Sequence, residues 1–282
     1  MSTHFGIEIE VSDIGFEGTG RRFSQNNVMD KLVRKHWKEQ VSDDQNINCG
    51  IDHCGFEYRT PKMLTSSDNI RKIRKFLDGL QSEVGENIPA SQSLFFRDTG
   101  MHVHVDVTTL NKAARNNMFK TFFMFEHLLL KCQPICRTNN SWCNSMQTVE
   151  KIRDDHENIN RLDFSRPRSA NNPLSRWCSA VGVCLSDHYP TVEVRYGRST
   201  FKSNDVINWV LLLIMIVENA KHMPEDFKVP FTPAKKISQN SKEDFLSFIE
   251  NVQLEKRWMK NLRKSVARWV DSKCRTVSVD NG

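Results

Sequence analysis

The sequence has 282 residues, which suits one large domain or two small ones and allows a sizeable hydrophobic core. Hydrophobic residues make up 38% and charged residues 26%, an ordinary balance for a soluble protein, and the longest apolar run, Trp209 to Val217, is too short to span a bilayer. The formal net charge of +6 fits nucleic-acid contact and also fits an enzyme that holds a polyanion such as ATP in a positive cleft. The Lys and Arg residues are dispersed, with no block of five or six, which favours the enzyme.

The first predicted element is the stretch Phe5–Val11, which alternates strictly between apolar and other residues. In a strand, its four apolar side chains share one face, and Glu8 and Glu10 lie on the other. Two carboxylates placed two residues apart repel each other, so either water screens them or a cation lies between them. The same two residues interrupt the apolar start that a signal peptide needs, so we expect a cytoplasmic protein.

The remaining elements are strands separated by helices of very different lengths. Further strands are predicted at 55–60, 101–107, 177–185 and 191–196. Helices are predicted at 26–37, from Ser66 or Ser67 to 80, and at 109–131, 205–221, 242–252 and 255–271. This order favours an α+β fold in which helices pack on one side of a mostly antiparallel sheet.

We expect two regions along the chain. Residues 1–222 form the main domain, in which the polar stretch 138–173 is a lid or an insertion. Residues 223–282 form a C-terminal helical extension packed on the same domain, and 224–233 read as a linker. The eight cysteines include no Cys-x-x-Cys pair, so we expect reduced, mostly buried thiols rather than a structural zinc site.

Four of the predicted strands share an unusual pattern, with one apolar face and one face of charged or ligand-type side chains. The charged faces carry Glu8 and Glu10, then Glu57 and Arg59, then His102, His104 and Asp106, and finally Glu193 and Arg195. A sheet with one face in water would explain any single strand. A solvated face usually carries Lys, Thr, Ser and Gln, however, and these faces carry no Lys. If the strands share one sheet, the charges converge, and a cation with an anionic ligand would neutralise them.

The residue types indicate the chemistry of such a site. Carboxylates suit hard divalent cations such as Mg²⁺ or Mn²⁺, and arginines suit bidentate capture of phosphate or carboxylate. Metal ions, arginine and phosphate together are the apparatus of phosphoryl transfer. The sequence contains no G-x-x-x-x-G-K-[ST] loop, so any ATP must be held in another way.

Five pieces of the sequence, in this order, resemble the glutamine synthetase and glutamate–cysteine ligase superfamily, and within it the amidoligase family. They are FGIEIE at 5–10, FEYRTP at 56–61, TGMHVHVD at 99–106, RW at 176–177 and VEVRYGRST at 192–200. The resemblance implies a glutamine synthetase-like curved antiparallel sheet, an open half-barrel with helices on its outer face. It also implies ATP-dependent joining of a small-molecule or peptide carboxylate to an amine through an acyl phosphate.

The resemblance assigns roles by position. It implies two Mg²⁺ (or Mn²⁺) ions, one held by Glu10 and Glu57 and the other by Glu8, His102 and Glu193. Arg195, Arg176 and Arg198 match catalytic contacts to phosphate or substrate, and His104, Arg59 and Arg195 match contacts to ATP. The chain departs from the family at 44–46, where Asp-Gln-Asn replaces the frequent Asp-Gly-Ser.

Two other functions stay open at this point. One is a metal-dependent phosphotransferase on the same fold, and the other is a nucleic-acid- or protein-binding module that has lost catalysis. The clustered carboxylates argue against the binding module, because such a module has no need of them. We expect no membrane partner, and a homo-oligomer is left open.

Overall fold

The computed structural model describes residues 3–12, 42–43, 55–87, 99–133, 145–146, 181–185, 190–229 and 241–276, and every structural statement below concerns these residues. The strands are β1 (His4–Ser12), β2 (Ser42–Asp43), β3 (Gly55–Arg59), β4 (Met63–Leu64), β5 (Gly100–Asp106), β6 (Val181–Leu185) and β7 (Pro190–Arg198). The helices are α2 (Ser67–Asn87), α3 (Lys112–Lys131), α5 (Ser203–Ala220), α6 (Lys242–Asn251) and α7 (Arg257–Thr276). The predicted helix at 26–37 lies outside the described residues.

The strands form one open antiparallel sheet in the order β2-β3-β1-β5-β7-β6, with the short β4 paired to the start of β1. The prediction that four charged strands share one sheet is therefore confirmed. In the register, Glu8 lies opposite Arg59 on one side and His102 on the other, and Glu10 lies opposite Glu57. The short strands β2 and β4 were not predicted.

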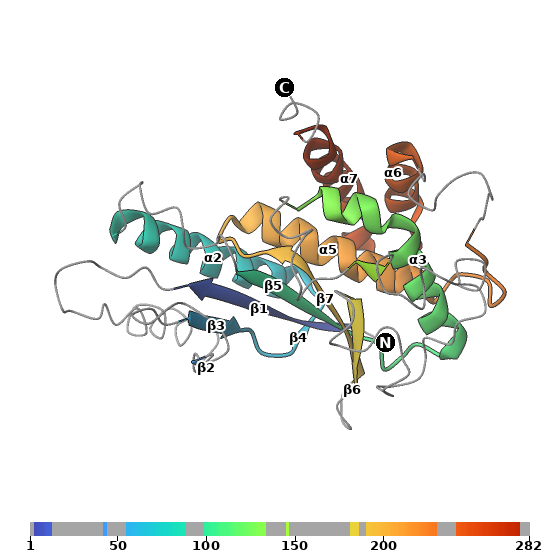
Figure 1. Cartoon of the computed structure of the whole chain (residues 1–282), viewed down its shortest axis with the longest axis horizontal. Coiled ribbons are helices and arrows are strands. Elements are labelled where there is room, and N and C mark those ends of the chain that lie inside the picture. Colours follow the sequence, from blue (N-terminus) through green and yellow to red (C-terminus); the bar gives the residue numbers. More distant parts are fainter. Residues whose placement is uncertain are drawn as a thin grey trace.

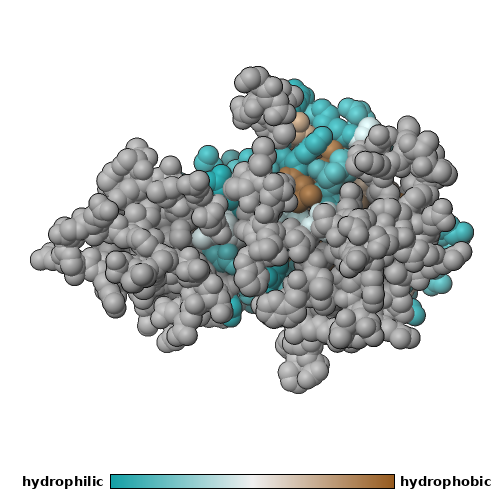
Figure 2. Space-filling model, in the orientation of Figure 1, coloured by the Kyte–Doolittle hydropathy of each residue, from teal (hydrophilic) through white to brown (hydrophobic). Residues whose placement is uncertain are grey.

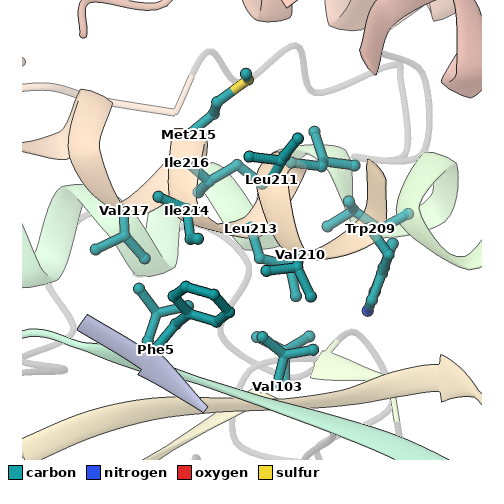
Figure 3. Packing of buried hydrophobic residues seen from close by; sticks show 14 of the residues in the cluster. Phe5, Val103, Trp209, Val210, Leu211, Leu213, Ile214, Met215, Ile216 and Val217 are labelled. Atoms are coloured by element: carbon teal, nitrogen blue, oxygen red, sulfur yellow. The ribbon is translucent and has the colours of Figure 1, made fainter. Parts of the chain in front are cut away.

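Helices cover one face of this sheet, as predicted for the α+β class (Figure 1). α5 contacts β5 and is flanked by α2 and α3, while α6 and α7 pack on α3 and α5 beyond the sheet. Phe5 and Val103 project from the strands toward α5 (Figure 3). The alternation along β1 thus sends Phe5, Ile7 and Ile9 into the core and leaves Glu8 and Glu10 on the face away from the helices.

α5 is the central helix of the core. Fourteen of its side chains are buried, including every residue from Trp209 to Glu218. By length and composition alone this helix could cross a membrane, but 78% of it is buried inside the protein, as in the core helix of a soluble fold. In Figure 2 the described surface is mostly hydrophilic, with a small apolar area toward the helical side.

Local signals explain where the helices begin. The Ser66 hydroxyl accepts a hydrogen bond from the Asn69 backbone at 3.2 Å, so α2 is capped as predicted. α3 begins three residues later than predicted because the Asn111 side chain accepts from the Ala114 backbone at 2.8 Å. α7 continues to Thr276, past the predicted end at 271.

The C-terminal helices are tied to the rest of the protein by specific contacts. The Trp269 indole donates to Asp205 of α5 at 2.8 Å, and its ring lies 6.5 Å from that of Trp209. In the described part of the expected linker, residues 224–229 pack against α3, and the buried ammonium of Lys120 donates to the Phe227 carbonyl at 2.6 Å. The division at residue 222 into a domain and an extension stays a prediction.

One irregularity lies in the pairing of β5 with β7. The register shifts between Met101 and Val103, so that Arg195 and Tyr196 of β7 together face His102. This is a β-bulge, which bends a strand and re-aims its side chains. Tyr196 turns into the core, where its hydroxyl donates to Glu126 of α3, and Arg195 stays beside Glu193.

We expect Gly197→Ala to lower the free energy of unfolding by about 1–3 kcal/mol, because overpacking forces backbone shifts. A Cβ atom at this position would lie 2.7 Å from the carbonyl oxygen of Met101. Gly6→Ala is the matched control, since its Cβ would meet nothing closer than Thr60 at 3.9 Å and should change stability by no more than about 0.5 kcal/mol. Urea denaturation of both variants measures the difference, and equal stability would show that β7 does not approach Met101 as described.

Candidate active site

The polar side chains of β1, β3, β5 and β7 converge on the sheet face that the helices leave open. β1 contributes Glu8 and Glu10, β5 contributes His102 and His104, and β7 contributes Glu193. Strand alternation explains this placement, because every second residue of each strand points to the same face. Arg59 of β3 and Arg195 of β7 flank the group on its two sides.

Glu8, His102 and Glu193 form the centre of the cluster. Each offers one ligand atom, and these atoms all lie within 4.8 Å of one another. The Nδ1 atom of His102 lies 3.3 Å from Glu8 Oε2 and 3.7 Å from Glu193 Oε1. Glu193 is only 3% exposed, so its carboxylate is almost removed from water. A buried carboxylate at such a meeting of strands needs positive charge beside it.

Glu10 lies on the other side of the His102 ring. Its Oε1 atom is 3.3 Å from His102 Nε2, and its Oε2 atom accepts a hydrogen bond of 2.6 Å from the Gly100 backbone. The backbone of Glu57 pairs with that of Glu10, but its side chain lies outside the described part. The pairing of Glu10 with Glu57 at a second ion therefore stays a prediction.

His104 also lies beside the carboxylates of the cluster. Its Nε2 atom is 3.5 Å from Glu8 Oε1 and 3.8 Å from Glu193 Oε1, and Nδ1 is 3.2 Å from the Thr191 hydroxyl. The Nε2 atom is buried and has no hydrogen-bond partner at normal geometry. A buried imidazole nitrogen aimed at two carboxylates is a donor atom suited to a cation held between them.

The predicted arginines differ in their surroundings. Arg195 is buried, and its Nε atom lies 2.8 Å from Glu193 Oε1. Arg59 is 56% exposed, and its Nε atom lies 3.4 Å from Glu8 Oε1. Arg198 ends β7, where its backbone donates to the Gln133 side chain at 3.0 Å. Arg176 lies outside the described residues, and the contacts of all four with substrate or ATP stay predictions.

The open face extends beyond the predicted site to Asp106, two residues after His104. Its carboxylate lies 3.5 Å from His4 Nδ1 and 3.6 Å from Lys62 Nζ, and it accepts from the Thr108 backbone at 2.8 Å. Burial raises the pKa of Asp106, but the hydrogen bonds from Thr108 and the two nearby bases outweigh it and hold the pKa below its usual value. The alternation of β5 placed Asp106 on this face without indicating these partners.

The donor set fits a divalent cation. Three carboxylates and two imidazoles meet within a few ångströms, and oxygen with nitrogen donors suits Mn²⁺ and Mg²⁺ in phosphate-handling sites. The orphaned Nε2 of His104 supports the same conclusion, because a bound cation would give it a partner. The arrangement can therefore hold a cation, and Arg195 can hold an anion beside it.

Comparisons with known proteins identify the family of this chain. A model of the family described as "Putative amidoligase enzyme" matches residues 1–217, which include β1 to β7 and most of α5. No curated protein matches the sequence. One matching solved structure is the crystal structure of the complex between Prokaryotic Ubiquitin-like Protein Pup and its ligase PafA. It is 14% identical with a TM-score of 0.41, and the match covers 99% of this chain but only 65% of that chain. Since the family model covers most of the sequence, this protein belongs to the amidoligase family.

Proposed function

We propose that this protein is an ATP-dependent carboxylate–amine ligase that forms an amide or peptide-like bond. In this reaction the carboxylate substrate takes the terminal phosphoryl group of ATP to give an acyl phosphate, and the amine then displaces phosphate. The observation that carries the proposal is the convergence of Glu8, His102 and Glu193 on the open face of the sheet. Membership of the amidoligase family supports the reaction class.

The residues of the cluster would hold two divalent cations. Glu8, His102 and Glu193 would hold one divalent cation, and Glu10 with Glu57 would hold the second. When bound, such cations neutralise the phosphate oxygens of ATP and the charge that develops during phosphoryl transfer. The backbone of Gly100 orients the Glu10 carboxylate by a direct hydrogen bond.

We propose that Arg195 contacts the transferring phosphoryl group. Its contact with Glu193 holds the guanidinium rigidly next to the cation ligands, so its positive charge is already in place before substrate binds. A preorganised guanidinium stabilises a transferring phosphoryl group without further side-chain ordering. Arg59, Arg176 and Arg198 are proposed as further contacts to nucleotide or substrate, and His104 as a contact to the nucleotide or to the cation between Glu8 and Glu193.

The proposal also covers the form of the sheet, the substrates and the place of the reaction. We propose that the antiparallel sheet has the curved, half-open form of glutamine synthetase and that the open face binds the substrates. The substrates are a small-molecule or peptide carboxylate and an amine, and we expect the reaction to take place in the cytoplasm. The match to the ligase of a ubiquitin-like protein adds a protein side chain to the substrates worth testing.

An assay of ADP and phosphate release on the full chain tests the function. We expect turnover of ATP only when Mg²⁺ or Mn²⁺, a carboxylate and an amine are all present, and mass spectrometry should find the condensed product. Phosphorylated substrate without an amide would support a phosphotransferase instead. No turnover across the panel, together with salt-sensitive binding to RNA or DNA, would contradict the proposal and favour a binding module.

A further inference from the structure

The outer face of α7 carries a row of positive charges. This helix has seven basic side chains and one acidic side chain, so its formal charge of +6 equals that of the whole protein. Four of the basic side chains are exposed and follow one another at intervals of three or four residues, which brings them to one face of the helix although other residues separate them in the sequence. We call this row the α7 stripe: Arg257, Lys260, Lys264 and Arg268.

Within the described residues, no ion pair joins the α7 stripe to an acidic side chain. The acids near this helix are used elsewhere, since Asp271 contacts Arg275 and, at 2.9 Å, Lys242, and Asp205 of α5 lies 2.9 Å from Lys273. Like charges four residues apart destabilise a helix, and positive charges in the first turn oppose the helix dipole. A polyanion bound along α7 would relieve both penalties.

A hollow beside the first turns of α7 extends this positive surface. Its volume is about 290 Å³, and its lining includes His222, Lys260 and Arg263, with Glu255 as the one acidic member. The guanidinium of Arg263 is held in place, because it donates to the Val252 carbonyl at 3.0 Å. A concave surface with an excess of one sign of charge concentrates the electric field, so this end of α7 attracts anions most strongly.

The apolar side chains of α7 are turned away from the α7 stripe and into the protein. Met259, Val266 and Val270 are buried, and Trp258 and Trp269 pack against the same core. An amphipathic helix that enters a membrane needs a free apolar face, and a protein partner is usually anchored by apolar or aromatic side chains. On α7 these side chains are already in use, so charge must supply the affinity, as it does for the phosphates of nucleic acids.

We propose that the α7 stripe binds the phosphodiester backbone of a nucleic acid. The stripe runs over about 16 Å of a regular helix at 1.5 Å per residue, and each of its four side chains can contact one phosphate. Contacts of this kind position a nucleic acid without reading its bases. α7 packs on α5, on the side away from the sheet (Figure 1), so this surface is separate from the open face and the inference does not depend on the proposed ligase activity.

Fluorescence anisotropy of labelled oligonucleotides with the full chain tests the proposal. The probes are a short single-stranded RNA, a single-stranded DNA of the same sequence and the corresponding DNA duplex, which together show whether RNA or DNA supplies the phosphates. Four neutralised phosphates predict that the logarithm of the affinity falls with the logarithm of the salt concentration with a slope of about −2.8 for single strands and about −3.6 for the duplex. Between about 50 and about 200 mM KCl, binding of a single strand should therefore weaken about 50-fold.

Two variants with the same change in net charge separate the α7 stripe from the charge of the whole protein. The stripe variant replaces all four side chains of the α7 stripe by glutamine. The control variant replaces four exposed lysines on other elements by glutamine, and these are Lys72, Lys75, Lys202 and Lys228. We expect the stripe variant to lose most of its binding and the salt slope for single strands to become shallower by about 3, whereas the control variant should stay within about threefold of the wild type because distant exposed charges are screened.

Several results would overturn the proposal. They are no binding of any probe at the lower salt concentration, wild-type binding by the stripe variant, or equal losses in the stripe and control variants. Competition by polyglutamate or by phosphatidylserine vesicles as strong as that by unlabelled nucleic acid would also contradict it, and would indicate an acidic protein or a membrane as the partner. Circular dichroism checks the folding of each variant, and if the stripe variant does not fold, Lys264→Gln alone should make the slope shallower by about 0.7.

Discussion

Replacing Glu193 by glutamine is expected to abolish divalent-cation-dependent turnover of ATP, with a loss of at least about 100-fold, because even residues behind a metal ligand contribute 10- to 100-fold. Glutamine keeps the shape and removes the negative charge. Glu193 is the most buried carboxylate of the cluster, and it contacts His102, His104 and Arg195 at once. ADP release at saturating ATP and Mg²⁺ measures the effect, and Glu8→Gln should behave in the same way.

Glu250→Gln is the control for this result. Glu250 lies on the exposed face of α6, far in the fold from the open face of the sheet, and its replacement should leave turnover unchanged. Wild-type turnover in Glu193→Gln would show that Glu193 is not a ligand of the cation. A thermal unfolding profile of each variant separates loss of chemistry from loss of folding.

The largest effect on stability is expected at Glu126, a fully buried carboxylate on α3. It accepts hydrogen bonds from the Ser145 hydroxyl at 2.6 Å, from the Met146 backbone at 2.5 Å and from the Tyr196 hydroxyl. Glu126→Ala leaves these donors without their acceptor inside the core and opens a cavity. We expect a loss of about 3–5 kcal/mol in the free energy of unfolding, as for other broken buried networks.

Urea denaturation measures this loss, and Tyr196→Phe is a milder variant of the same hydrogen-bond network. Tyr196→Phe removes one donor while the carboxylate keeps two, so a loss of about 1 kcal/mol is expected. Tyr196 follows Arg195 in the bulge of β7, so both variants should also loosen the strand that carries the site. A change below about 0.5 kcal/mol in Glu126→Ala would mean that the carboxylate does not bind these donors.

The strands of the site could be predicted because their alternation is local. In β1, the side chains of Phe5, Ile7 and Ile9 enter the core and the two carboxylates face away from it. This period of two is visible in the sequence without any partner strand. The same period in β5 and β7 placed His102 and Glu193 on the shared face. The class of the fold followed from the same pattern, since helices can cover only the apolar face.

The contacts between strands could not be predicted, because they depend on register and on the bulge. His102 lies between Glu8 and Glu10 only because β5 pairs with β1 in one particular register. The extra residue in β7, which places Arg195 and Tyr196 together opposite His102, leaves no signal in a single sequence. Glu126 is the one acidic residue of α3, but its hydrogen-bond donors come from segments distant in the sequence, which a single sequence does not indicate.

Binding of Mn²⁺ to the wild-type protein and to Glu193→Gln, followed by electron paramagnetic resonance of the free ion, tests the central claim most directly. The claim is that the open face of the sheet holds a divalent cation between Glu8, His102 and Glu193. It predicts that the wild type removes Mn²⁺ from solution, more strongly with ATP present, and that Glu193→Gln binds it at least about 10-fold more weakly. Equal Mn²⁺ binding by the two proteins, or none by the wild type, would contradict the claim.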